Sequence, residues 1–272
     1  MKKLKFVHIT KCGGTTIENI AKKNNVYWGR FDNEYKKAIS ENEGPLKIDL
    51  WHYAPRYMKP NKLKYILDKY DFFTVVRNPY SRMISEYYSY WGPKHNITEN
   101  KDQFNKTITE FLEQTKEKLR NIDDLLCCHY IPQWLYLLDK DGNIIIRNII
   151  KQENLNDEFN QLMTTYGYSI RLSRNNKNNP ALGDKFTVKD LSKKNIDLIN
   201  EIYQKDFELF GYEMIHRYSS KKNSVKQNNN KSKQNNNKPK QNNNKPKQNN
   251  HKQLKNNNRE ESFFETISKL IL

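Results

Sequence analysis

Residues 8–20 have the sequence HITKCGGTTIENI, and this stretch decides the fold. Residues 4–9 form an apolar run that suits a strand buried on both faces. A helix is expected from Thr15 to about Lys23, and Gly13 and Gly14 let the chain turn sharply between the two elements. A buried strand that runs through a glycine turn into a helix indicates an α/β fold with a mainly parallel sheet.

A second unit of the same kind occupies residues 71–91, with the sequence DFFTVVRNPYSRMISEYYSYW. Residues 72–76 predict another buried strand, and the segment beyond Asn78 predicts a helix. Asn78 is a favoured N-cap residue, and Pro79 suits the first helical position because an amide proton is not needed there. The chain therefore repeats the strand-turn-helix pattern.

The other elements continue the alternation of strands and helices. We expect a short strand that ends near Trp51, a hairpin of two strands within residues 131–151, and helices over residues 61–70, 105–119, 153–166 and 190–210. This order predicts a three-layer α/β sandwich of the P-loop type, in which helices flank a central, mainly parallel sheet.

The glycine turn has the features of an anion-binding loop. Its backbone amides can point into one concavity, and the helix that follows adds the positive end of its dipole. Lys11 supplies a mobile positive charge, and Thr15 and Thr16 supply hydroxyl donors. In an ATP-binding P-loop the lysine follows the last glycine, whereas here it precedes both. The alternative interpretation is a tight turn with a helix cap and no ligand.

A second anion site is expected at the next junction. Arg77 closes the strand of residues 72–76, and Ser81 lies in the first turn of the following helix. A ligand with anionic groups at two separated places would satisfy both junctions.

These motifs resemble those of the nucleotide-dependent sulfotransferases, in particular the branch that acts on carbohydrates such as heparan and chondroitin sulfates. HITKCGGTTIENI is similar to the 5′-phosphosulfate loop of that family, and VVRNPYSRMISEYY resembles its 3′-phosphate segment, with a serine four residues after an arginine. Three weaker landmarks follow in the expected order: HYIPQWLYL, IIKQENLNDEF and YQKDFELFGY. The resemblance spans most of residues 4–213.

The resemblance implies 3′-phosphoadenosine 5′-phosphosulfate (PAPS) as co-substrate and an in-line transfer of its sulfuryl group to a hydroxyl or amine. Lys11 would stabilise the charge that grows on the leaving oxygen, Arg77 and Ser81 would bind the 3′-phosphate, and no metal is expected. The 5′-phosphosulfate would be bound by Lys11, Cys12, Gly13, Gly14, Thr15 and Thr16.

An acceptor hydroxyl needs a general base, and histidine suits neutral pH. His52, in the segment LWHYAPRYM, is our first choice, because the family often has a histidine in that region. The alternative is that His52 packs among aromatic neighbours for structure alone. His129 is the competing base or an acceptor contact, Glu18 is a third possible base, and His8 is expected to be structural.

Cys12 could carry a reactive thiol, because a helix N-terminus lowers a thiol pKa. A spectator thiol is the favoured interpretation, since the loop needs only the backbone amide of this residue. The three cysteines, Cys12, Cys127 and Cys128, do not form a disulfide framework and favour a reducing compartment. We see no signal peptide or membrane anchor, so a soluble intracellular or cytoplasmic protein is expected.

The C-terminal part is expected to differ from the folded domain of residues 1–218. Residues 219–258 are rich in Asn, Lys and Gln, repeat KQNNN every seven residues, and predict a disordered linker. Residues 259–272 predict a short amphipathic helix that docks on the domain or on a partner. Residues 219–272 carry +10 of the net charge of +17, which favours non-specific contact with polyanions.

Two other functions remain open from the sequence. A nucleotide kinase of the P-loop superfamily would share the architecture, but it would need the lysine after the glycines. A non-catalytic polyanion-binding protein would act through the basic tail. The acceptor is open as well, because a glycan is favoured by the resemblance alone.

Overall fold

The computed structural model describes residues 2–40, 50–90, 92, 100–120, 128, 129, 131–173 and 186–216. Met1–His216 forms one compact unit. The predicted linker of residues 219–258, the predicted helix of residues 259–272 and the domain boundary at residue 218 lie outside the described residues.

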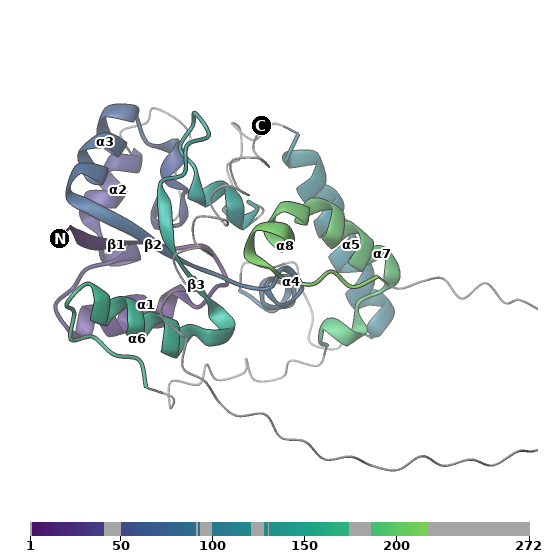
Figure 1. The fold of residues 1–272 in the computed structure, drawn as a ribbon. Helices are drawn as coiled ribbons and strands as arrows, with labels where there is room; N and C mark the ends of the chain where they lie inside the picture. Colours follow the sequence, from purple (N-terminus) through teal and green to yellow (C-terminus); the bar gives the residue numbers. More distant parts are fainter. Residues whose placement is uncertain are drawn as a thin grey trace, which may run out of the picture. The chain divides into compact units, whose positions relative to one another are not determined.

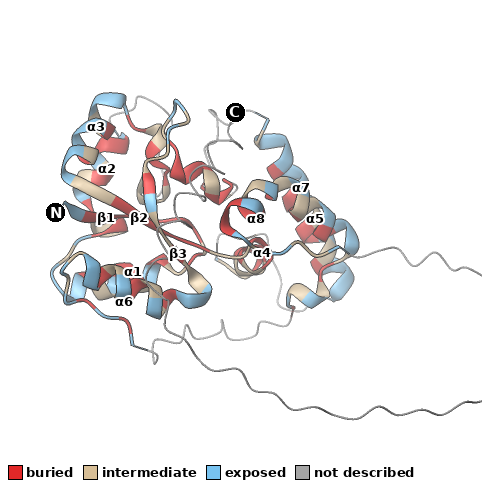
Figure 2. Ribbon diagram, in the orientation of Figure 1, coloured by how far each residue is buried: buried red, intermediate tan, exposed pale blue. Residues whose placement is uncertain are grey.

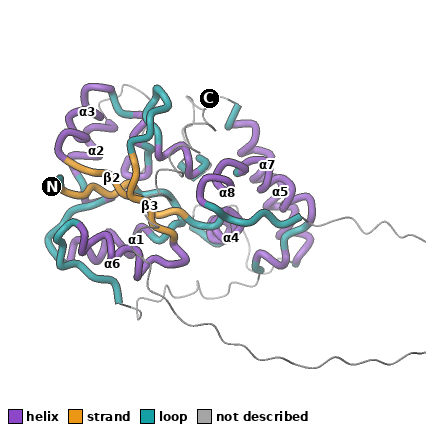
Figure 3. Tube along the Cα trace, in the orientation of Figure 1, coloured by secondary structure: helices purple, strands orange, loops and turns teal. Residues whose placement is uncertain are grey.

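The described strands form one parallel sheet in the order β1-β2-β3 (Figures 1 and 3). Its members are β1 (Lys3–Val7), β2 (Tyr70–Val76) and β3 (Ile146–Lys151). Val7 pairs with Thr74, and Val76 pairs with Lys151. Because the strands are parallel, their carboxyl ends meet at one edge, and the glycine loop and Arg77 both begin there.

Helices cover both faces of this sheet (Figure 1). On one side lie α2 (Asn33–Ser40) and α3 (Pro60–Lys69), and on the other lie α1 (Gly14–Lys23) and α6 (Leu155–Thr165). The middle strand β2 is almost fully buried, as expected for a strand between two helical layers (Figure 2). The predicted α/β class with a parallel sheet flanked by helices is confirmed.

The remaining long helices pack together as a second apolar cluster. They are α4 (Pro79–Tyr87), α5 (Lys101–Lys118), α7 (Lys193–Ile202) and α8 (Gln204–Phe210). Tyr80, Phe104, Ile199 and Phe207 are among its buried side chains. Helix α4 also begins at the end of β2, so it joins this cluster to the sheet and to the site described below.

Short 3₁₀ helices make up much of the rest of the described chain. Their bounds are Gly29–Phe31, Leu50–His52, Pro55–Tyr57, Gln133–Leu137, Gln152–Asn154 and Val188–Asp190.

The two decisive junctions match their predictions closely. Helix α1 begins after the glycine turn, although β1 ends at Val7, two residues before the predicted end. Asn78 is the N-cap of α4, and its side chain accepts hydrogen bonds from the amides of Tyr80 (3.0 Å) and Ser81 (3.4 Å). Pro79 occupies the first turn, as its sequence context predicts.

Three predictions of secondary structure are wrong in part. Trp51 lies in a 3₁₀ helix rather than at a strand end. The expected hairpin is reduced to one antiparallel bridge, Leu138 to Ile144, and β3 pairs with β2 instead. The long C-terminal helix is divided at Tyr203, whose backbone leaves the helical region at φ −110° and ψ 23°.

Candidate active site

The loop between β1 and α1 holds an unusual backbone. Lys11 has φ +64° and Gly13 has φ +88°, so two residues of the loop adopt the left-handed region. For a non-glycine residue this conformation costs about 1–2 kcal/mol. Gly13 caps α1 without a side chain, and the first turn of α1 carries no acidic residue. The positive end of the helix dipole is thus left for a ligand.

Besides Lys11, the side chains of Thr15 and Thr16 and the backbone of Cys12 were predicted to bind a nucleotide. Thr15 is exposed and Thr16 is half-buried, and both lie in the first turn of α1. The thiol of Cys12 is buried and donates to the carbonyl of Thr10 (3.4 Å) and to Oε1 of Gln133 (3.2 Å). Burial raises the pKa of Cys12 to about 12, so the thiol is neutral and only the backbone of Cys12 suits ligand binding.

Gly14 is required by a close approach to His8. A Cβ atom on Gly14 would lie 2.2 Å from the imidazole of His8. That imidazole is buried, and its Nδ1 lies 2.6 Å from Oε1 of Glu18. Glu18 is buried too and also accepts from the amide of Arg30 (3.0 Å). These contacts favour a structural role for His8 and Glu18 beneath the loop.

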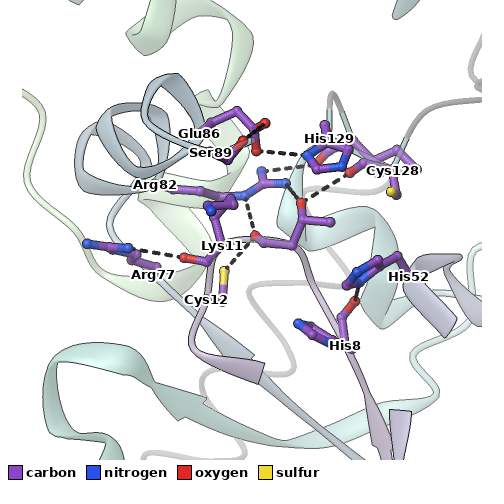
Figure 4. Close-up of polar contacts among 12 residues, drawn as sticks. His8, Lys11, Cys12, His52, Arg77, Arg82, Glu86, Ser89, Cys128 and His129 are labelled. Carbon is purple, nitrogen blue, oxygen red and sulfur yellow. Dashed lines mark hydrogen bonds and ion pairs between the residues drawn. The ribbon is translucent and has the colours of Figure 1, made fainter. Parts of the chain in front are cut away.

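The two junctions lie in direct contact at the carboxyl edge of the sheet. Nη1 of Arg77, which follows β2, donates to the carbonyl oxygen of Lys11 at 3.1 Å (Figure 4). The guanidinium of Arg77 is thereby held beside Lys11, and both residues were predicted to bind the anionic nucleotide.

Gln133 ties this arrangement together from a third segment. Its side chain accepts from the amide of Arg77 (2.8 Å) and donates to the carbonyl of Arg77 (2.8 Å). Gln133 is fully buried, and its own amide donates to Asp206 on α8 (3.0 Å). Asp206 also accepts from the amide of Trp134 (2.8 Å), and burial raises its pKa despite these bonds. These bonds satisfy the backbone of residues 133 and 134, where the sequence analysis had expected a strand.

The start of α4 is less suited to an anion than the sequence suggests. Because Asn78 caps the helix, the amides of Tyr80 and Ser81 are already engaged. The amide of Asn78 donates to Glu153, which places a carboxylate beside this turn (2.9 Å). The half-buried side chain of Ser81 remains one helical turn from a second serine, Ser85, on the same helix.

Arg82 was not singled out from the sequence, yet it organises the site. Its guanidinium is buried and makes two hydrogen bonds to Thr10. Nε donates to the carbonyl of Thr10 (3.2 Å), and Nη2 donates to its hydroxyl (3.2 Å). Nη1 donates to the carbonyl of Ile131 (3.0 Å). The helical period supplies a signal for it, because Arg82 and Glu86 are four residues apart and share one face of α4.

Glu86, also missed from the sequence, forms a pair with His129. The buried Oε2 of Glu86 lies 2.9 Å from Nδ1 of His129, and Oε1 accepts from the hydroxyl of Ser89 at 3.1 Å (Figure 4). Burial alone would raise the pKa of Glu86, but the hydrogen bond and charge of His129, with Lys11 and Arg82, hold it below its usual value. Glu86 is therefore ionised at neutral pH.

His52 contacts the backbone and the ring of His8 instead of a carboxylate. Its Nδ1 lies 3.2 Å from the carbonyl oxygen of His8, and the two imidazoles meet edge to face with centroids 4.2 Å apart. Burial, followed by the nearby His8, lowers the pKa of His52 to about 2. His52 is therefore neutral, and since a carbonyl can only accept, its proton is on Nδ1.

One tyrosine connects the two segments that carry His52 and His129. The hydroxyl of Tyr136 donates to the carbonyl of His52 (2.8 Å) and lies 3.4 Å from the carbonyl of Cys128. The positive charge of Lys11 lowers the pKa of both His52 and Glu86. The structure thus brings Lys11, Arg77, His52 and His129 into one neighbourhood (Figure 4).

Within the described residues, no group of three or more His, Cys, Asp or Glu side chains could hold a metal ion. In the same part of the chain, no helix is both long and apolar enough to cross a bilayer.

A comparison with known protein families agrees with this geometry. Residues 1–213 match the model of the Sulfotransferase family. The chain belongs to the sulfotransferase family. The protein is thus a PAPS-dependent transferase. The family match favours a sulfotransferase over the alternative of a nucleotide kinase. No curated protein and no solved structure matches this sulfotransferase.

The residues at the carboxyl edge of the sheet fit an anionic nucleotide. The loop offers a helix N-terminus without an acidic first turn, and Lys11, Arg77 and Arg82 bring positive charge to it. Arg82 is buried and donates to carbonyl and hydroxyl oxygens, which are neutral, so its charge adds positive potential to the loop.

Proposed function

We propose that this sulfotransferase moves a sulfuryl group from PAPS to a hydroxyl group of a carbohydrate. The observation that supports it best is the contact between Arg77 and the carbonyl of Lys11, because it unites two predicted anion sites in one place. The carbohydrate acceptor is supported by the resemblance of the two motifs to the carbohydrate branch.

In this proposal each end of the nucleotide has its own set of residues. The 5′-phosphosulfate is bound by Lys11, by the backbone of Cys12, Gly13 and Gly14, and by the hydroxyls of Thr15 and Thr16. The 3′-phosphate is bound by Arg77 and Ser81. Since the amides at the start of α4 are engaged by Asn78, side chains rather than backbone must bind this phosphate. Ser85, one turn further, is the natural second hydroxyl.

PAPS supplies an activated sulfuryl group when it is bound. Lys11 places its positive charge near the oxygen that leaves with the nucleotide, and it stabilises the charge that develops there. A histidine, either His52 or His129, accepts the proton of the attacking hydroxyl. The described residues need no metal for these roles.

Binding of the desulfonated nucleotide tests the proposal directly. Calorimetry with 3′,5′-adenosine bisphosphate is expected to show binding, whereas ATP with Mg²⁺ is expected to bind more weakly because it lacks a 3′-phosphate. Absence of bisphosphate binding to the wild-type protein would refute the proposed function.

The acceptor can be found by transfer of label from ³⁵S-labelled PAPS. A panel of desulfated heparan, desulfated chondroitin, N-acetylglucosamine, p-nitrophenol and a tyrosine peptide separates glycans from other acceptors. Labelling of a glycan is the expected result, and exclusive labelling of the phenol or peptide would contradict the carbohydrate proposal.

A further inference from the structure

Two buried carboxylates among the described residues each contact a histidine, and the two histidines differ in how far they are exposed. Glu18 contacts Nδ1 of His8 at 2.6 Å, and Glu86 contacts Nδ1 of His129 at 2.9 Å. The side chain of His8 is only 6% exposed, whereas that of His129 is 17% exposed. An acceptor can therefore reach the imidazole of His129 but not that of His8.

Within the second pair, only the histidine is accessible. The side chain of Glu86 is 3% exposed, and its two oxygens are used by His129 and Ser89. Glu86 therefore cannot touch an acceptor, and it acts on the reaction only through His129. Because an ionised carboxylate can only accept, the bond places the proton of neutral His129 on Nδ1 and leaves the lone pair of Nε2 available.

His52 is the rival base, and its surroundings oppose protonation. Its Nδ1 faces a carbonyl oxygen rather than a carboxylate, and its ring meets that of His8. Nδ1 of His52 contacts a neutral carbonyl oxygen, whereas Nδ1 of His129 contacts a carboxylate directly. A proton that arrives during the reaction is therefore better stabilised on His129.

We propose that His129 is the general base of this sulfotransferase and that Glu86 is its positioning residue. The inference rests on the proposed function and assigns the proton transfer at the same site. His52 then acts as a neutral hydrogen-bonding group beside the acceptor.

One bond to sulfur forms while another breaks in the transfer step. The acceptor oxygen forms a bond to sulfur while the bond from sulfur to the 5′-phosphate oxygen breaks, and that bonding pair stays on the phosphate oxygen. The acceptor proton passes to Nε2 of His129. The imidazolium that results is compensated by Glu86, and the proton is later released to water.

Helix α4 couples this base to nucleotide binding. It carries Ser81 near its start and Glu86 immediately before its last residue, Tyr87. Arg82, between them, fixes α4 to Thr10 in the loop. Arg82 faces the pair from α4 itself, and Lys11, His52 and Tyr203 face it from other segments.

The first test does not depend on activity. Nitrogen-15 spectra of histidine-labelled protein with 3′,5′-adenosine bisphosphate bound report which ring nitrogen of neutral His129 carries the proton. Protonation on Nδ1 is expected in wild type, because the ionised carboxylate of Glu86 can only accept. A proton on Nε2 would overturn the inference.

The second test follows the rate at which PAPS releases 3′,5′-adenosine bisphosphate in a single turnover, with water as the probe acceptor. His129→Ala should lower this rate by about 100-fold or more, and Glu86→Gln by about 10- to 100-fold. Affinity for the bisphosphate should stay within about threefold of wild type in both variants, which shows that the fold is retained.

A matched control separates positioning from packing. Glu86→Gln should reduce the share of neutral His129 that carries its proton on Nδ1, because an amide can accept or donate there and no longer fixes the tautomer. Glu18→Gln alters the buried pair of His8 instead, and it should leave the proton of His129 on Nδ1. An unchanged Nδ1 share in Glu86→Gln, or an unchanged rate in His129→Ala, would overturn the inference. Absence of bisphosphate binding to wild type would instead refute the proposed function.

Discussion

The guanidinium of Arg77 and the backbone carbonyl of Lys11 are joined by a hydrogen bond of 3.1 Å. The residue that follows β2 thereby stabilises the loop that follows β1, although the two residues are 66 positions apart in the chain. Lys11 has a left-handed backbone, which the loop must stabilise from outside. Arg77 is thus placed both to bind a phosphate and to maintain the loop.

Replacement of Arg77 should weaken nucleotide binding. Arg77→Ala removes a charged hydrogen-bond donor, and about 1.5–3 kcal/mol of binding free energy should be lost, or roughly 10- to 100-fold in affinity. Calorimetry with 3′,5′-adenosine bisphosphate measures it. Arg120→Ala, at an exposed arginine beyond α5, is the control. Equal affinity in the two variants would contradict the assignment of Arg77.

Lys11 should be needed for activity although its left-handed backbone lowers the stability of the protein. Lys11→Ala and Lys11→Gly both remove the ammonium group, and each should lower turnover by about 100- to 1,000-fold. Glycine adopts φ +64° without strain, whereas alanine does not. The free energy of unfolding of Lys11→Gly should therefore be about 0.5–1 kcal/mol larger than that of Lys11→Ala. Denaturant unfolding measures the difference, and the reverse order would contradict a strained loop.

Gly14 and Gly167 should respond to alanine for different reasons. Gly14→Ala places Cβ against the imidazole of His8, so overpacking should cost about 1–3 kcal/mol and also disturb nucleotide binding. Gly167→Ala has open space around its Cβ and meets only the strain of φ +72°. It should leave bisphosphate affinity unchanged. Thermal unfolding and calorimetry of both variants test this contrast, which fails if Gly14→Ala binds as well as Gly167→Ala.

His52 should make the domain sensitive to acid. Its pKa is lowered to about 2 by burial and by His8, whereas in the unfolded chain it titrates near 6.5. Between these values the unfolded state binds the extra proton, so stability rises with pH and is lost as pH falls below about 6.5. The slope reaches about 1.4 kcal/mol per pH unit.

The variant His52→Asn tests that slope, because its amide can still donate to the carbonyl of His8 but does not titrate. Unfolding free energies at pH 7 and pH 5 should differ less in His52→Asn than in wild type. His216→Asn, at an exposed position, should keep the wild-type difference. An unchanged difference in His52→Asn would show that His52 is not held neutral.

The sequence predicts the structure best where the signal is local. The glycine turn before Thr15 and the cap at Asn78 depend on neighbours within a few residues, and both junctions formed as predicted. It predicts the structure least well for residues 131–151, where a partner far along the chain changes the outcome. Asp206 binds the amides of Gln133 and Trp134, so these residues do not form the expected strand.

Turn residues, caps and buried apolar runs act over short distances, so the two strand-to-helix junctions and the cationic residues Lys11 and Arg77 could be predicted from the sequence. The contact of an accessible histidine with a carboxylate could not, because it arises from packing. Glu86 and His129 are 43 residues apart, and their pairing depends on how α4 packs beside the end of the sheet. Burial and charge at a site come from neighbours that sequence spacing does not reveal.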